Sequence, residues 1–236
     1  MATAEEAVLM VAGDRRELTG VLARCRDVRR LRLGLPLAVR ATLCGRPVLL
    51  GANGPGAALA AEAVRRLATA QRLCALVSTG CCGALDPSFA PGEVVVATEV
   101  CLVPGELRFA ARLPAVAGPH RTARLVSVER IVVRAAEKAA LRPYGEAVEM
   151  EAAAVARESQ VLGVPFYAVR VVLDGAGESF QLDYNVVRGA DGRFSARRLL
   201  WAALRRPRVA REVLELRRRL RSVAEVLGEF LAGCEF

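Results

Sequence analysis

Two stretches carry most of what this sequence says about its fold: Ala147-Val-Glu-Met-Glu-Ala-Ala-Ala-Val-Ala156 and Phe166-Tyr-Ala-Val-Arg-Val-Val-Leu-Asp174. The first predicts a strand that ends near Glu149 and a helix that continues to about Leu162. The second predicts an apolar strand that ends at a lone aspartate. Carboxylates beside buried apolar runs are costly unless they are paired or used in chemistry. The competing interpretation is a surface junction whose acidic residues favour a helix N-terminus.

Strands and helices alternate along the rest of the chain. We expect strands at residues 7–12, 73–78, 94–103 and 124–128, a hairpin-like pair at 37–43 and 48–50, and helices at 57–68 and 129–141. Such alternation is typical of parallel sheets that are covered on both faces. The sequence therefore predicts one α/β domain over residues 1–236, a three-layer sandwich with a mixed, mostly parallel sheet between helices.

Composition narrows the class of protein. The chain has 236 residues, 53% of them hydrophobic and 5% aromatic, which suits a core of Val, Leu and Ala. No apolar run reaches the roughly 18 residues that a membrane span needs, and the acids Glu5 and Glu6 do not fit a secretion signal. Seven cysteines without a CxxC pair, and one histidine, give no zinc pattern. We expect a cytoplasmic protein with reduced thiols, no metal and no cofactor.

The C-terminal part carries much of the net charge of +9. A short helix over 194–204 stops before Pro207, and apolar residues then recur at helical spacing to Phe230. Residues 194–232 are thus predicted to form a basic amphipathic helical tail. Its arginines fit an anionic membrane surface or simply a solvated face. Aromatic residues are scarce and no nucleic-acid-binding signature is present, so no nucleic-acid partner is expected.

Two glycine-containing turns are predicted at strand ends, Gly51–Gly56 and Gly80–Gly83. Ligands of parallel α/β proteins collect at the carboxyl ends of strands, where loops and helix N-termini offer backbone N–H groups. Neither turn matches the phosphate-loop or the dinucleotide-binding pattern. Each turn alone is weak evidence for a site.

Five sequence elements occur together in one order. They are Val8–Glu17, Gly51–Gly56, Ser78–Leu85 with Pro91–Val96, Val148-Glu-Met-Glu151 and Arg170-Val-Val-Leu-Asp174. With them the chain resembles the nucleoside phosphorylase and nucleosidase superfamily, particularly the methylthioadenosine/S-adenosylhomocysteine nucleosidase branch. The resemblance covers roughly residues 8–174. The Val-Glu-Met-Glu element is quite specific, and the ordered set is stronger than any one member.

The resemblance implies cleavage of an N-glycosidic bond through an oxocarbenium-like transition state. That reaction needs an acid for the purine, a grip on the ribose hydroxyls and a nucleophile on the far face. Asp174 matches the general acid that protonates purine N7, and Glu151 the carboxylate that binds the ribose hydroxyls. Met150 matches an apolar contact under the sugar. Glu17 matches the residue that activates the attacking water.

Other positions depart from the family pattern. Ile131 and Val132 fall in the purine slot, where an aromatic residue is usual, and Leu173 replaces a usual serine. Cys81, after Gly80 in the second turn, stands where a small polar residue is common. These residues remain candidate binding residues.

The identity of the nucleophile also stays open. Glu17 occupies a place near which related phosphorylases hold phosphate with arginine, which favours hydrolysis. The adjacent Arg15 and Arg16 keep phosphate open as a co-substrate.

The layout after Asp174 resembles hopanoid-associated phosphorylases, which remove adenine from adenosylhopane. This resemblance implies a lipid-linked substrate and a peripheral position at the inner membrane, where the arginine-rich face would contact anionic headgroups. Residues 104–114 fall where the family builds its pocket for the 5′ substituent, with Leu107, Phe109 and Leu113 as an apolar channel.

Several alternatives remain at this stage. One rival is a soluble methylthioadenosine or S-adenosylhomocysteine nucleosidase, or another purine nucleoside phosphorylase. The rival from another class is a non-catalytic basic module on the same fold. The family resemblance also implies a homodimer. Glu149 has no assigned task beyond a structural one, and Arg170 either pairs with a glutamate or lies on the surface.

Overall fold

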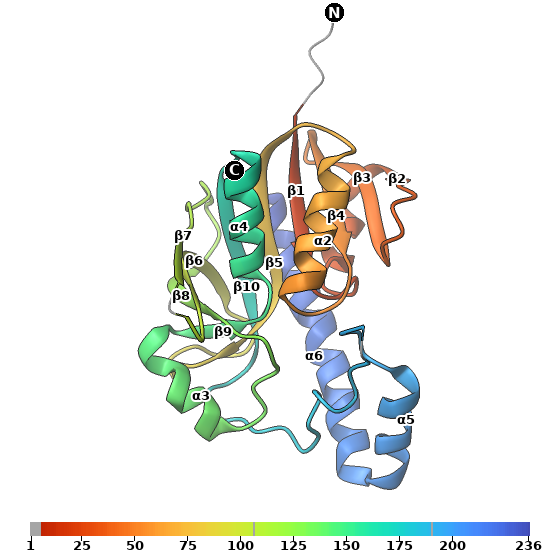
Figure 1. Cartoon of the computed structure of the whole chain (residues 1–236), viewed down its shortest axis with the longest axis vertical. Helices are drawn as coiled ribbons and strands as arrows, with labels where there is room; N and C mark the ends of the chain where they lie inside the picture. The colour runs from red at the N-terminus through yellow and green to blue at the C-terminus, as the bar shows by residue number, and fades with distance from the viewer. Residues whose placement is uncertain (1–5, 106, 190) are drawn as a thin grey trace, which may run out of the picture.

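The computed structural model describes residues 6–105, 107–189 and 191–236 (Figure 1). Glu5 of the acidic N-terminus and Glu106 of the expected 5′-substituent pocket therefore lie outside the described residues. In chain order the elements are β1 (Ala7–Ala12), α1 (Thr19–Arg24), β2 (Cys25–Arg30), β3 (Leu37–Leu43), β4 (Arg46–Ala52), α2 (Ala57–Ala68), β5 (Leu73–Ala84), β6 (Val94–Leu102), β7 (Leu107–Ala110), β8 (Arg121–Ser127), α3 (Ala135–Leu141), the single-turn η1 (Arg142–Tyr144), β9 (Ala147–Glu149), α4 (Ala152–Leu162), β10 (Phe166–Asp174), α5 (Ala196–Arg205) and α6 (Pro207–Ala232).

The described strands join in one mixed sheet. Its centre is parallel, with β4, β1, β5 and β10 side by side, and antiparallel pairs lie towards the edges. Strand β10 pairs with both β5 and β6, so β5, β9, β8, β6 and β10 close into a small barrel. The register sets Asp174 opposite Gly83 and Glu149 opposite Ser127. Val148 of β9 and Asp174 of β10 both pair with Gly83 of β5, so the two carboxylates lie beside the same segment of β5.

Helices cover both faces of the sheet, which gives the three layers (Figure 1). Alanine-rich stripes of α2 and α4 pack on one face, in a core cluster that includes Leu67 and Val155. On the other face α1 and the C-terminal half of α6 contribute Val21 and Leu227. Small alanines let the helices approach the pleated surface closely. The predicted α/β fold is confirmed.

Helices α1 and α6 cross at a contact that only glycine permits. A Cβ on Gly20 would lie 2.0 Å from the backbone oxygen of Ala224, and one on Gly228 would lie 2.2 Å from the backbone of Gly20. The last turns of α6 are therefore part of the main core, with Leu227 and Leu231 fully buried. This half of the predicted tail is not a separate appendage.

The N-terminal half of α6 behaves differently. Together with α5 it forms a helical hairpin that projects beyond the end of the sheet (Figure 1). Its small core contains Leu182, Val187 and Val209. No helix within the described residues is both long and apolar enough to cross a membrane.

Two local predictions were wrong. Strand β5 does not end at Ser78 but continues to Ala84 through the expected turn, because β10 pairs alongside it as far as Gly83. The helix expected from Glu129 begins only at Ala135. The backbone before it is held elsewhere, since Ile131 N–H donates to the Asn185 side chain at 2.9 Å.

Candidate active site

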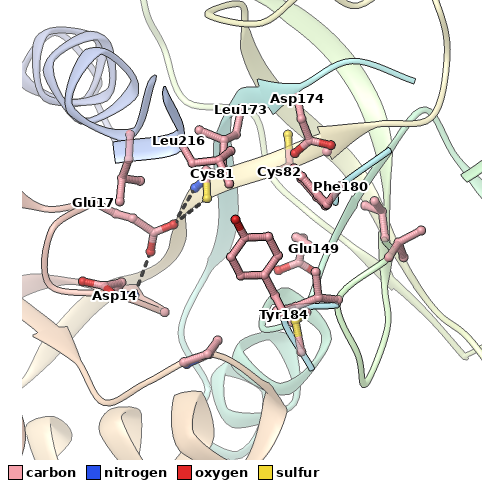
Figure 2. A pocket seen from close by; sticks show the side chains of 18 of the residues that line it. Asp14, Glu17, Cys81, Cys82, Glu149, Leu173, Asp174, Phe180, Tyr184 and Leu216 are labelled. Carbon is pink, nitrogen blue, oxygen red and sulfur yellow. Dashed lines mark hydrogen bonds between the residues drawn. The ribbon is translucent and has the colours of Figure 1, made fainter. Parts of the chain in front are cut away.

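A cavity of about 290 Å³ opens at the carboxyl ends of β1, β9 and β10. Its wall brings together most of the predicted site residues, which are Glu17, Cys81, Ile131, Val132, Met150, Glu151, Leu173 and Asp174. Figure 2 shows Glu17 on one side of this pocket and Asp174 on the other. Ligand clefts of parallel α/β folds lie at this end of the sheet. The sequence elements that were far apart in the chain therefore meet at one site.

Glu17 follows β1 and is almost completely buried. Its carboxylate accepts hydrogen bonds from Asp14 N–H at 2.8 Å, Cys81 N–H at 2.9 Å and the Cys81 thiol at 2.8 Å (Figure 2). Burial raises the pKa of Glu17 above its ordinary value, and these hydrogen bonds oppose that rise only in part. The group is thus fixed in position and is more basic than a surface carboxylate, as a residue that takes a proton from water must be.

Glu149 and Arg170 form a buried ion pair beneath the cavity. Glu149 also accepts hydrogen bonds from the Ser127 hydroxyl, from Glu151 N–H at 2.9 Å and from Ala152 N–H at 2.7 Å. The last two are free amide groups at the start of α4, which a carboxylate there stabilises. Glu149 therefore caps the helix and holds Arg170, and Arg170 is fully buried and not a surface arginine.

Glu151 lies between this pair and the cavity. Its carboxylate accepts a hydrogen bond from Gly56 N–H at 2.9 Å and lies 3.6 Å from the Arg170 guanidinium. Burial, and secondly the negative charge of Glu149, raise the pKa of Glu151 to about 7, although Arg170 opposes the shift. Its neighbour Met150 is buried in the cavity wall. The Val-Glu-Met-Glu element thus supplies two carboxylates to the cavity wall, of which Glu149 is held by Arg170 and by the start of α4.

Asp174, at the end of β10, forms a buried ion pair with Lys138 of α3. The Lys138 ammonium also donates to the backbone oxygen of Gly175 at 2.6 Å. Burial raises the pKa of Asp174 above its ordinary value, while the nearby Lys138 charge opposes the rise. A raised pKa favours the protonated form of the carboxyl group, which a general acid requires.

The sequence matches the family model of the phosphorylase superfamily over residues 36–205. The chain belongs to this superfamily. Its membership confirms the predicted enzyme class, a nucleosidase or phosphorylase.

Solved structures share the fold over nearly the whole chain. The 5′-methylthioadenosine/S-adenosylhomocysteine nucleosidase of Neisseria meningitidis, in complex with methylthio-immucillin-A, matches with a TM-score of 0.72 and 21% identity over 97% of both chains. Futalosine hydrolase of Helicobacter pylori matches with a TM-score of 0.72 and 15% identity over 97% of both chains. The S-adenosylhomocysteine nucleosidase of Streptococcus pyogenes matches with a TM-score of 0.72 and 17% identity, over 99% of this chain and 97% of that one. The TM-scores establish a common fold.

An aromatic wall lines part of the cavity, and sequence reasoning missed it. Phe180 and Tyr184 line the cavity together with Ile131 and Val132, and their rings meet edge to face with centroids 5.5 Å apart. Asn185 fixes the segment by donating to Ile131 C=O and accepting from Ile131 N–H, both at 2.9 Å. The aromatic residues that are absent at positions 131 and 132 are thus supplied from the segment after β10.

The α5–α6 hairpin forms part of the cavity wall. Its contribution is mostly apolar, with Leu199, Val213, Leu216 and Leu220 next to Phe194 just before α5, and it includes one arginine, Arg217. Two arginines tie the preceding segment to the turn that follows β4, with Arg188 donating to Pro55 C=O and Arg193 to Asn53 C=O, each at 2.9 Å. The hairpin is therefore a wall of the site as well as an extension of the fold.

Two predicted binding residues do not line this cavity. Phe109 is buried in the core beneath α4, and Leu107 and Leu113 are half exposed, so the expected channel through residues 104–114 is not part of the cavity. Strand β7 draws Phe109 inward by pairing with β6. Gly80 lies behind Glu17 and has a φ of +128°, and a Cβ there would lie 2.9 Å from the carboxylate. Gly80 makes room for Glu17 and does not face a ligand.

Lys138 was also missed, although the sequence carried a signal for it. Of the 34 basic Lys and Arg residues, 33 are arginine, so Lys138 is the single lysine. It is also among the largest fully buried side chains of the described residues. A chain that uses arginine at every other basic position has a reason to keep an ammonium group here.

Among the described residues no cluster of His, Cys, Asp and Glu is arranged to hold a metal ion. The chemistry available to the site is that of its carboxylates, the Lys138 ammonium and the Cys81 thiol. Burial and the Glu17 carboxylate raise the pKa of Cys81 well above its ordinary value, so the thiol is neutral and acts as a donor.

Proposed function

We propose that this enzyme cleaves the N-glycosidic bond of an adenosine with an apolar 5′ substituent and releases adenine. One observation carries the proposal. Four buried carboxylates line the cavity, Glu17, Glu149, Glu151 and Asp174, of which Glu149 is paired with Arg170, and the α5–α6 hairpin adds a mostly apolar wall. Carboxylates with separate tasks suit glycosidic cleavage, and an apolar wall suits a hydrocarbon group.

The proposed roles follow from the position of each carboxylate. Asp174, at the base end, donates a proton to purine N7 while the C1′–N9 bond breaks and its electron pair moves into the purine ring. Glu151 accepts hydrogen bonds from the ribose hydroxyls, with Met150 packed under the sugar. Glu17 takes a proton from a water molecule that attacks C1′ on the face opposite the base. The carboxylates of Glu17 and Glu151 around the sugar also favour the positive charge that develops on the ribosyl ring.

We infer water as the nucleophile. Glu17 occupies the nucleophile end of the cavity, and its burial and negative charge oppose an anionic phosphate. Phosphate remains the alternative co-substrate because Arg16 lines the same cavity. Arg15 is exposed and does not line it.

The favoured substrate is adenosylhopane, whose 5′ group is a large hydrocarbon. The hairpin that supplies the apolar wall also exposes Leu200, Trp201 and Leu204, with 61%, 58% and 76% of their surface accessible. Arg205 lies over the Trp201 ring at 3.6 Å. Residues 194–232 contain ten arginines and four glutamates, which is six of the net nine positive charges. Exposed aromatic and apolar side chains among arginines are typical of a surface that binds anionic lipid headgroups.

We propose that the enzyme is peripheral at the inner membrane and takes its substrate there. A homodimer is also proposed from the family resemblance, with a neighbouring subunit close to the 5′ group. Light scattering across a concentration series measures the oligomeric state, and a monomer at every concentration would contradict the homodimer.

Adenine release measured by chromatography tests the proposed function. The substrates are methylthioadenosine, S-adenosylhomocysteine and adenosines with increasingly long 5′-alkyl groups, each with and without phosphate. We expect kcat/KM to rise with alkyl length and to be independent of phosphate. Preference for methylthioadenosine would support the soluble nucleosidase instead, and a phosphate requirement would support phosphorolysis. No release from any of these nucleosides would leave the non-catalytic basic module as the better interpretation.

A further inference from the structure

The base end of the cavity contains a cation whose chemical type is unusual for this chain. Lys138 projects from α3 to Asp174 and is only 1% exposed. Its ammonium contacts the Asp174 carboxylate and Gly175 C=O, and it lies 5.8 Å from the centroid of the Phe180 ring. Both Lys138 and Phe180 line the cavity. The ion pair is thus part of the site and is not a distant support.

A guanidinium would balance the Asp174 charge equally well and would keep its proton. Arginine is effectively always protonated in proteins, whereas a buried ammonium can release a proton. The chain has arginine at each of its 33 other Lys or Arg positions. The exception falls beside the one carboxylate that is expected to act as an acid. Proton transfer explains why position 138 has lysine and not arginine, and charge balance alone does not.

The surroundings favour sharing of a proton within the pair. In a buried site the neutral forms of an amine and a carboxylic acid are favoured over separated charges. Other groups near Asp174 are Cys82, Glu178 and Arg219, and the last two bind each other at 2.7 Å. Their opposite charges largely cancel, which leaves Lys138 and Asp174 as the groups that exchange a proton at this end.

We propose that Lys138 supplies the proton that Asp174 delivers to the purine, an inference that rests on the proposed glycosidic cleavage. The proton moves from Nζ to Oδ2 of Asp174, and Asp174 donates a proton to N7 as the C1′–N9 bond breaks. Adenine leaves as the neutral N7–H form, and the pair is left as an amine and a carboxylate. Water that attacks C1′ gives its proton to Glu17. Exchange with solvent then removes that proton and recharges Lys138.

Proton supply by Lys138 differs from catalysis by Asp174 alone in what happens to the general acid at alkaline pH. Asp174 alone would lose its proton as the pH rises and could not act as an acid. Paired with an ammonium, it regains a proton from Lys138 during each cleavage. Lys138 acts through Asp174 and does not itself touch the reacting atoms, so its tests must separate proton supply from simple positioning.

Lys138→Arg and Lys138→Met make that separation. Lys138→Arg keeps the charge and removes the transferable proton, and Lys138→Met removes both. We expect each to lower kcat by about 100-fold with little change in KM. In Lys138→Met the alkaline limb of the pH profile should also move to lower pH. The control is Arg142→Met, which removes an exposed cation paired with Asp86 and should leave activity unchanged. Wild-type kcat in Lys138→Arg, or an unmoved alkaline limb in Lys138→Met, would overturn the proposal.

Amine rescue covers the case in which a large side chain does not fit. Lys138→Ala leaves space at the pair, and added methylamine or ethylamine should restore part of kcat when the variant is folded. Tetramethylammonium is a cation without a transferable proton and should not restore it. Equal rescue by both would assign Lys138 to charge balance and would contradict proton supply.

A measurement without turnover separates this proposal from the substrate assignment. Because the chain has one lysine, protein labelled with ¹³Cε-lysine gives one lysine signal without further assignment. In Asp174→Asn this signal should change its chemical shift, since the buried ammonium loses the carboxylate that it contacts. No change would overturn the pairing itself. A change together with no adenine release would instead show that the proposed function fails while the pair stands.

Discussion

The carboxylates of the cavity and the mostly apolar wall of the α5–α6 hairpin are built by different elements. Glu17 follows β1 of the central sheet, whereas Glu151 and Asp174 lie at the ends of β9 and β10 in the closed barrel. Backbone N–H groups or buried partners fix each of them. The hairpin of α5 and the first half of α6 has its own small core and several exposed apolar side chains. A rigid sheet fixes the groups that must be placed accurately, whereas a peripheral hairpin can change its lining without disturbing them. In the proposed function the carboxylates therefore carry out the reaction, and the hairpin selects the substrate.

Removal of the carboxylates should have the largest effect. We expect Asp174→Asn and Glu17→Gln each to lower kcat by about 10³-fold, because the proton donor or the base is lost while the shape is kept. Steady-state release of adenine from a short 5′-alkyl adenosine measures this. Leu200→Ser on the exposed side of the hairpin is the control and should keep wild-type kcat. A loss below tenfold for either carboxylate variant would refute its assigned role.

Changes in the apolar wall should affect binding rather than chemistry. Leu216→Ala removes an apolar contact of the cavity and should raise KM for a long 5′-alkyl substrate by about 10-fold to 100-fold, at nearly constant kcat. The same variant should treat methylthioadenosine almost as the wild type does. Phe109→Leu, in the core outside this cavity, is the matched comparison and should show no such selectivity. Equal changes in KM for long and short substrates would contradict a separate role of the hairpin wall in the choice of substrate.

The pH dependence provides a test of intermediate size. In its proposed role Glu151 accepts hydrogen bonds from the ribose hydroxyls as a carboxylate, and its pKa is raised to about 7 by burial and by Glu149. Protonation below that pH removes the acceptor, so kcat/KM should fall about tenfold for each unit of pH on the acid side. The raised pKa of Glu17 acts in the same direction, because the base must also be deprotonated.

Glu151→Gln identifies the source of the acid limb. The variant should be less active and should keep only the part of the limb that belongs to Glu17. Wild-type kcat/KM that stays flat between about pH 5.5 and about pH 8 would contradict a role for the ionised form of Glu151.

Loss of exposed apolar contacts on the hairpin should have the smallest effect. We expect Trp201→Ser with Leu204→Ser to weaken sedimentation with anionic vesicles by about tenfold, because two side chains no longer enter the interface. Turnover of a short soluble substrate should not change. Val161→Ser removes an equally exposed apolar residue from α4, with 81% of its surface accessible, and should bind vesicles normally. Equal binding to neutral and anionic vesicles would refute the proposed contact between the hairpin arginines and anionic headgroups.

Prediction from the sequence succeeded where a pattern was local. The alanine-rich stripe of α2 gave its bounds of Ala57 and Ala68, and the apolar run before Asp174 gave β10. It failed where distant partners decided the outcome. The Gly80–Gly83 segment has the composition of a turn, but pairing with β10 keeps it extended. Phe109 was expected beside the 5′ group, and its pairing partner β6 holds it in the core instead.

The sequence by itself determined the alternating α/β order, the family motifs and the identity of the candidate carboxylates, because each depends on residue types at short or ordered spacings. Residue type alone could not separate Glu149 from Glu151, and only the family resemblance assigned Glu151 to the ribose. The tertiary structure places both beside the cavity and separates them by their partners, because Glu149 binds Arg170 and the start of α4 whereas Glu151 accepts from Gly56 N–H. It also joins Lys138 to Asp174 across 36 positions of chain. Contacts of that range arise from strand register and helix packing, which no local pattern encodes.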